Sequence, residues 1–424
     1  MILTAEVAII NRFGIALAAD SAVTIGNERV WKSTNKLFSL GPNSDIAIMI
    51  YGGGDFIGVP WEIIIKSFRE FYGNVSFEHV SECREKFRDF LKKPEWSSDF
   101  EEDLSFAGII VKELEELNQT ISPKTSKEFR KELEDWIGIC EEQIKEKEVF
   151  DDGLKLSDFR NHFSGYVDKF CSDIFKKHVP KSIKKKLEKY LFEYLRRKDC
   201  ASGYQTGVVF AGYGEEEHYP VILELIVDGR CNGFLRAWHG RTTDLNKNRQ
   251  MLATVIPFAQ RDMTNVFMEG VSSAYLSFFF NLISGILDRK TKYLLDNFMP
   301  DADAKLVEEQ IQKKENKGLL KDIGKAFERW RAETAIDPLM DSIRSLPREE
   351  MAAMAEALVE LTSLRRKIDS HIQSVAGPVD VAFISKGDGL VWMKRKHYFD
   401  PEINNDFFSR KKARQSVRRH GDEA

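Results

Sequence analysis

The first fifty residues constrain the fold of this 424-residue chain more than any other stretch, because three apolar runs follow one another there. Val7–Ile10 and Ile15–Ala19 flank a segment that ends in Gly14, and a glycine between two apolar runs is typical of a β-hairpin. The third run, Ile46–Ile50, leads into the glycines at 52–54. We therefore expect this stretch to form the beginning of a β-sheet core.

Two charged segments without strand character interrupt the rest of the chain, and apolar residues recur in them at helical spacing. Strand patterns return at Thr206–Gly214, at a hairpin expected around Asp228-Gly229, and near the C-terminus. Residues 248–290 are expected to be helical. This alternation predicts an α+β fold, a four-layer αββα sandwich with two helical insertions. The predicted core comprises residues 1–95, 201–295 and 346–400, the insertions are residues 96–200 and 296–345, and a basic tail covers residues 401–424.

Composition narrows the classes of partner. A net charge of −4, from 63 basic and 67 acidic residues, gives no reason to expect nucleic acid or a membrane surface as partner. Five cysteines without a CxxC pair indicate reduced thiols in a cytoplasmic protein, and the eight histidines show no metal spacing. The start of the chain lacks the pattern of a signal peptide. Ala274–Leu287 is too short to span a bilayer, and we expect it to form a buried helix.

Thr4, Asp20 and Lys36 interrupt the apolar runs with complementary chemistry. A threonine at a free N-terminus can use its own α-amine as the base that removes its hydroxyl proton. A lysine ammonium nearby lowers the pKa of that hydroxyl, and a carboxylate holds the lysine in place and charged. The N–H groups of Gly53 and Gly54 are suitable oxyanion donors, because no side chain blocks an approaching carbonyl. The set predicts hydrolysis through an acyl-enzyme.

The spacing of these residues resembles the proteasome-like family of N-terminal-nucleophile hydrolases, which includes proteasome β-subunits and their bacterial homologues. Two segments carry the resemblance, with their separations counted back to Thr4: Phe13-Gly-Ile-Ala-Leu-Ala-Ala-Asp20 and Ser33-Thr-Asn-Lys36-Leu-Phe. The resemblance implies that Thr4 is the nucleophile, that Lys36 tunes its hydroxyl and that Asp20 orients Lys36. It also implies that Thr24 contacts the substrate backbone.

The resemblance further implies a cytoplasmic threonine-type endopeptidase that cleaves peptides or proteins and needs no cofactor or metal. Members of this family confine their active sites inside rings, so we expect a homo-oligomer, for which a ring is one arrangement. Whether an ATPase is also a partner is left open. Neither a membrane nor nucleic acid is expected as a partner.

The segment Met1-Ile-Leu3 precedes Thr4, so processing must remove three residues before Thr4 has a free amine. Candidates for auxiliary serines are Ser272, Ser273 and Ser374, although serines at such positions are also typical of helix caps. The alternative function is a catalytically inactive scaffold or interaction subunit that keeps its N-terminus unprocessed.

Overall fold

A computed structural model describes most of the chain. The residues that it describes are 5–21, 23–25, 29–31, 34–121, 125–150, 154–198, 200, 205–231, 234–248, 250–298, 302–369, 378–397, 399–400, 402–404, 406–407 and 409.

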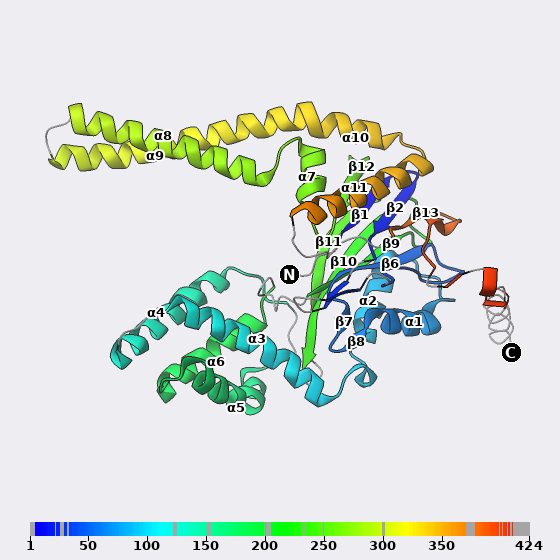
Figure 1. Cartoon of the computed structure of the whole chain (residues 1–424), viewed down its shortest axis with the longest axis horizontal. Coiled ribbons are helices and arrows are strands. Elements are labelled where there is room, and N and C mark those ends of the chain that lie inside the picture. The colour runs from blue at the N-terminus through cyan, green and yellow to red at the C-terminus, as the bar shows by residue number, and fades with distance from the viewer. Residues whose placement is uncertain are drawn as a thin grey trace.

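Two five-stranded antiparallel sheets form the centre of the molecule (Figure 1). The first has the strand order β12-β1-β2-β13-β14 and consists of β1 (Glu6–Asn11), β2 (Gly14–Ala19), β12 (Ala253–Pro257), β13 (Asp380–Ser385) and β14 (Gly389–Lys394). The second has the order β11-β10-β9-β6-β5 and consists of β5 (Leu37–Ser39), β6 (Ile46–Gly52), β9 (Thr206–Gly212), β10 (Val221–Cys231) and β11 (Phe234–Asp244). Two short pairs complete the strands, β3 (Val23–Ile25) with β4 (Arg29–Trp31) and β7 (Asp55–Phe56) with β8 (Val59–Pro60).

Alternation along the strands sends side chains to both faces of each sheet, and each face has an apolar cluster. One cluster joins the two sheets, for example through Leu17 of β2 and Met49 of β6. A second joins the first sheet to α11 (Arg348–Asp369), and a third joins the second sheet to α1 (Trp61–Tyr72) and α2 (Val80–Phe90). The expected mixed α and β structure with antiparallel sheets is confirmed, and the four-layer αββα assignment stays a prediction.

Four helices that lie between α2 and β9 in the sequence form a block with its own apolar core, to one side of the sheets (Figure 1). They are α3 (Asp99–Thr120), α4 (Ser126–Lys145), α5 (Leu156–Phe175) and α6 (Lys181–Leu195), preceded by a 3-10 turn at Pro94–Trp96. Two buried arginines on the long strands attach the block: Arg230 donates to Glu102 of α3 at 2.6 Å, and Arg236 donates to the backbone carbonyl of Leu195 in α6. The bounds of the predicted insertions stay a prediction.

A two-helix arm projects from the body at the other insertion (Figure 1). It follows α7 (Asp262–Glu269) and consists of α8 (Ser273–Phe298) and α9 (Ala302–Arg331), which continues through a π-helical turn at Ala332–Ile336 into α10 (Asp337–Arg344). The expectation of a buried helix at Ala274–Leu287 is wrong, because in α8 only Thr291 and Leu295 are buried. Among the described helices, none alone is long and apolar enough to cross a bilayer; α7 and α8 pass only when taken together, and they are bent by 70°.

Two expectations about strands differ from the structure. Asp228-Gly229 does not end a strand, because β10 continues through it to Cys231. The register with β11 shifts there, between Val227 and Arg230, and Gly229 has φ +117°; a glycine with positive φ suits such a bulge. The segment expected to be helical from residue 248 contains β12, which pairs with β1. The hairpin at Gly14 is confirmed, with Asn11 opposite Gly14.

Candidate functional site

Three acidic residues meet at one end of the first sheet because of its strand register. In the β1–β2 pair Glu6 lies opposite Ala19, and in the β2–β13 pair Asp380 lies opposite the same Ala19. Asp20 follows directly, and its backbone N–H donates to the carbonyl of Ala5 at 3.1 Å. The start of β1, the end of β2 and the start of β13 therefore bring three carboxylates together.

Lys36 enters this end from the second sheet, where it directly precedes β5. Its Nζ donates to Glu6 Oε1 at 2.8 Å and to Asp20 Oδ1. Burial is nearly complete, since Lys36 is 2 % exposed and both carboxylates are 1 % exposed. Burial alone would lower the pKa of Lys36, but the charges and hydrogen bonds of Glu6 and Asp20 outweigh it and raise that pKa above its ordinary value. Lys36 is thus a fixed positive charge and not a base.

Asp20 keeps one unsatisfied oxygen in this buried environment. Its Oδ1 accepts from Lys36, whereas its Oδ2 is buried without a hydrogen-bond donor in the part of the chain that the structure describes. A buried carboxylate oxygen without a donor costs free energy, so such an atom marks a place where a donor belongs. Ala5, the residue bonded to Thr4, is hydrogen-bonded to the backbone of this same Asp20.

A second lysine closes the cluster from the far end of the sequence. Lys396 follows β14, and its Nζ donates to the carbonyl of Thr34 at 2.6 Å, lies 3.3 Å from Asp380 Oδ2 and also contacts Ser21 Oγ. Burial lowers the pKa of Lys396; the charge of Lys36 acts in the same direction, and Asp380 opposes both. Lys396 therefore ties β13 to the segment that carries Lys36.

The glycine run lies beside this cluster, and some of its backbone groups are already hydrogen-bonded within the protein. The N–H of Ile50 donates to the carbonyl of Lys36 at 2.9 Å, and the glycines begin two residues later. The N–H of Gly53 donates to the carbonyl of Gln205 at 3.1 Å, so this amide is already bound and does not serve as a free oxyanion donor in this structure. Gly54 is half-buried and accepts from Trp61 N–H at 3.3 Å through its carbonyl. Of the two predicted donors, the N–H of Gly54 remains.

The other predicted site residues are not part of the described cluster. Thr4 and Ser374 lie outside the described residues, and of Thr24 the structure describes the backbone, in β3, and not the side chain. Ser272 precedes α8 and its Oγ accepts from the N–H of Tyr275 at 3.1 Å, as a helix cap does. Ser273 is exposed at the first position of α8.

Three charged members of the cluster, Glu6, Asp380 and Lys396, were not predicted as site residues. Glu6 carried a signal, because an acidic residue inside an otherwise apolar strand must find a partner when the strand is buried. Lys396 carried none: it belongs to a basic run, Lys394-Arg395-Lys396, and its partner Ser21 is 375 positions away.

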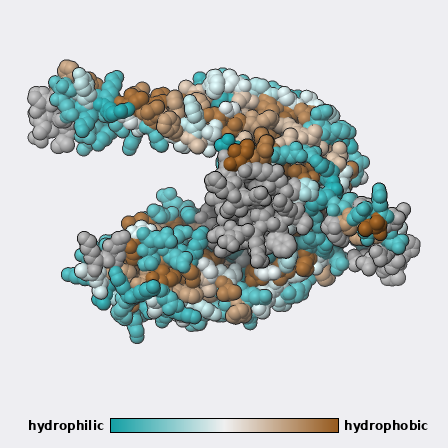
Figure 2. Space-filling model, viewed as in Figure 1, coloured by the Kyte–Doolittle hydropathy of each residue, from teal (hydrophilic) through white to brown (hydrophobic). Residues whose placement is uncertain are grey.

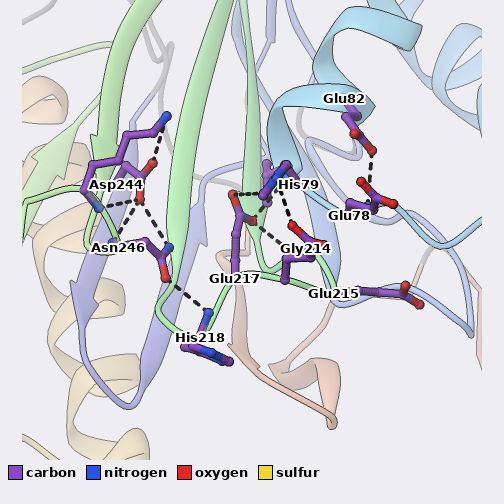
Figure 3. A network of polar contacts seen from close by, with 12 residues as sticks. Glu78, His79, Glu82, Gly214, Glu215, Glu217, His218, Asp244 and Asn246 are labelled. Carbon is purple, nitrogen blue, oxygen red and sulfur yellow. Dashed lines mark hydrogen bonds and ion pairs between the residues drawn. The ribbon is translucent and has the colours of Figure 1, made fainter.

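A second polar network lies at the opposite end of the second sheet (Figure 3). The β6–β9 register places Gly52 with Thr206 at one end and Ile46 with Gly212 at the other, so Gly214 and Glu217 are far from Lys36 along the strands. Glu217 Oε2 accepts the N–H groups of Gly214 at 2.7 Å and Val80 at 3.1 Å, and thereby fixes the start of α2. Within the described ranges, no group of three His, Cys, Asp or Glu side chains is arranged to hold a metal ion. We assign this network a structural role.

Comparisons with known proteins do not assign the chain to a family. No family model matches it, and no curated protein matches it. Solved structures that are similar include a Gly-1 mutant of Anbu from Hyphomicrobium sp. strain MC1, with 10% identity, a TM-score of 0.29 and coverage of 99% of both chains. Another Anbu structure from this strain has 10% identity and a TM-score of 0.26, and the match covers 97% of this chain and 96% of that chain.

The resemblance to the proteasome-like family is therefore wrong as a family assignment. TM-scores of 0.29 and 0.26 at 10% identity are too low to support a shared fold or function. The spacing of Thr4, Asp20 and Lys36 involves three residues, and so short a pattern can arise wherever a hairpin leads into a further strand. What the site does must be argued from its own geometry.

Proposed function

We propose that this protein hydrolyses amide bonds of peptides or proteins, with Thr4 as the nucleophile once Met1–Leu3 are removed. The observation that carries the proposal is the buried cluster at the start of β1, in which Lys36 is held between Glu6 and Asp20 while Asp20 Oδ2 has no donor among the described residues. A buried ammonium with so little access to water is suited to electrostatic work on a neighbouring hydroxyl.

The chemistry assigns separate tasks to the groups. Because Lys36 remains protonated, the proton of the Thr4 hydroxyl passes to the freed α-amine of Thr4, and the positive charge of Lys36 favours the alkoxide character of the oxygen. The oxygen attacks the amide carbonyl, and the N–H of Gly54 donates to the oxyanion. The α-ammonium then returns the proton to the leaving amine, which leaves an ester on Thr4. Water, deprotonated by the same amine, hydrolyses this ester.

The unsatisfied Oδ2 of Asp20 supports placing a hydrogen-bond donor of Thr4 next to it. The freed α-amine or the hydroxyl of Thr4 would satisfy Oδ2, since either group can donate a hydrogen bond. Ala5 links Thr4 to the cluster through its carbonyl contact with the backbone of Asp20. The reaction needs no metal and no cofactor, and we place it in the cytoplasm.

Intact-mass measurement tests the first requirement. We expect purified protein to contain a species shortened by Met1-Ile-Leu3, and this species to hydrolyse fluorogenic peptide amides. Thr4→Ala should abolish hydrolysis. Thr4→Ser keeps a hydroxyl and should retain part of the rate, which separates a nucleophile from a residue that only packs.

A chain that retains Met1 to Leu3 under all conditions, or a Thr4→Ala variant as active as the parent, rules the proposal out. In the first case the protein is better described as a non-enzymatic interaction subunit. The solvent-exposed apolar arm of α8 and α9 is the observation that favours this second function.

A further inference from the structure

The outer face of α8 carries a row of exposed apolar side chains. We call this row the outer stripe: Tyr275, Phe278, Leu282, Ile286 and Tyr293, each between 45% and 65% exposed. Its members follow one another in steps of three or four residues, with Arg289 filling the single polar position between Ile286 and Tyr293. This spacing keeps them on one side of a helix and is the spacing of a helix–helix seam.

The opposite face of α8 is already occupied by α9. Buried Thr291 accepts from Asn316 Nδ2 at 3.0 Å, and the ring of Phe280 lies 4.0 Å from where a Cβ on Gly324 would be. At 3.6 residues per turn, the outer stripe lies roughly half a turn away from Thr291. The stripe therefore points away from α9, and the arm stands off the body of the molecule (Figure 1). Figure 2 shows hydrophobic residues at the surface along this arm.

We propose that the outer stripe binds the outer stripe of a second copy of this chain, with the two α8 helices antiparallel about a two-fold axis that crosses the stripe at the level of Ser284. The stripe is self-complementary about this residue: Leu282 and Ile286 are each two positions from Ser284, and Tyr275 and Tyr293 are each nine positions from it. Antiparallel pairing thus places Leu282 on Ile286 of the second copy and Tyr275 on Tyr293 of the second copy.

The remaining members of the stripe also find partners in this arrangement. Phe278 is six positions before Ser284 and Arg289 is five after it, so antiparallel pairing brings the guanidinium of one copy beside the ring of the other. A guanidinium over an aromatic face is a favourable contact at a helix–helix seam. Arg289 is then the one charge on the stripe and it has a partner.

The contact is large enough for a specific dimer. A tyrosine or phenylalanine side chain contributes about 200 Å² when fully buried, so the exposed parts of the stripe amount to about 500 Å² per copy. Two copies together remove about 1,000 Å² from water, which is where specific interfaces begin. Flanking residues that are half-exposed, such as Phe279 and Ile283, add to this area. The pairing does not depend on hydrolysis at Thr4.

Sedimentation equilibrium of the full-length protein at micromolar concentrations tests the pairing. We expect a dimer for the parent protein and at least a tenfold weaker association for Leu282→Glu/Ile286→Glu, which places four like charges at the two-fold axis. The matched control is Ser277→Glu/Asn281→Glu, which adds the same charge at exposed positions of α8 off the stripe and should leave the dimer intact. Unchanged circular dichroism would show that the variants are folded.

A parent protein that is monomeric at these concentrations overturns the proposal, and so does a stripe variant that associates as the parent does. Sedimentation with phosphatidylcholine vesicles is the second measurement. A monomer that binds these vesicles through the stripe would identify a lipid surface as the occupant and would equally overturn the pairing. Leu282→Cys/Ile286→Cys should form a covalent dimer under mild oxidation, because the antiparallel arrangement places the two positions opposite each other.

Discussion

Glu6 and Lys36 form a buried ion pair of 2.8 Å that joins the first strand of one sheet to the segment entering the other. Asp20 shares the same ammonium, so the single positive charge of Lys36 serves two carboxylates that are both buried. Such an arrangement fixes the relative position of the two sheets, because moving either one leaves a buried charge without its partner.

Glu6→Gln should lower both the pKa of Lys36 and the stability of the fold. The amide can still accept a hydrogen bond from Nζ but no longer supplies a charge, and we expect a loss of about 2 kcal/mol in the free energy of unfolding. Urea denaturation measures it. Glu142→Gln is the control, because Glu142 pairs with Lys145 at an exposed position and should change stability by less than about 1 kcal/mol. Equal losses in both variants would contradict the pairing.

Local sequence signals predicted the parts of the fold that depend on local chemistry. The hairpin at Gly14 follows from a turn residue between two apolar runs, and the register confirms it. Asp228-Gly229 has the same signature but lies inside a strand, because pairing with the neighbouring strand turned the glycine into a bulge. A turn motif does not reveal whether the neighbouring strand continues past it.

The site was predictable to the extent that its members lie on consecutive strands. Asp20 and Lys36 belong to one hairpin and the segment after it, and the structure brings them together. Lys396 reaches the same place only through the pairing of β13 with β2, which no pattern near residue 396 indicates. The prediction for Ala274–Leu287 is wrong for a different reason. Apolar composition indicates that a helix has apolar surface to bury but not where it lies in the fold, and α8 lies on a projecting arm.

Gly52→Ala should lower the stability of the protein by more than the cost of placing an alanine at a positive φ. Gly52 has φ +87°, and a Cβ there would lie 2.5 Å from the carbonyl oxygen of Gln205. Gly58→Ala is the matched control, since Gly58 has φ +84° and nothing within 4 Å. The control isolates the conformational cost of about 1–2 kcal/mol. Thermal unfolding should show a larger loss for Gly52→Ala; similar losses would mean that Gln205 moves aside.

The buried thiols should resist alkylation in the folded protein. Burial raises the pKa of Cys140 to about 11 and that of Cys171 to about 12, with smaller contributions from neighbouring charges. Near pH 8.5 an ordinary thiol is about half ionised, whereas a far smaller fraction of Cys140 is thiolate. This difference in thiolate fraction, apart from any steric protection, should slow alkylation of Cys140 roughly a hundredfold. Iodoacetamide labelling followed by peptide mapping measures the rates. Protein unfolded in urea is the control, and rapid native labelling of Cys140 would contradict its burial.

Lys396→Met should change how stability depends on pH. Burial lowers the pKa of Lys396 in the folded protein, so between this value and the ordinary value of about 10.4 the unfolded chain binds more protons than the folded one. The free energy of unfolding of the parent therefore increases as the pH rises through this window, by at most about 1.4 kcal/mol per pH unit. Below about 10.4 Lys36 adds no slope, because its raised pKa keeps it protonated in both states.

Lys396→Met lacks this pH-dependent increase in stability, and it also lacks the hydrogen bond to the Thr34 carbonyl. The difference in stability between parent and Lys396→Met should therefore widen in favour of the parent as pH rises toward about 10. Urea denaturation at a series of pH values on both proteins measures the difference directly, and lysines common to both cancel. A difference that is constant, or that narrows with rising pH, would show that Lys396 is not held as a desolvated ammonium beside Asp380.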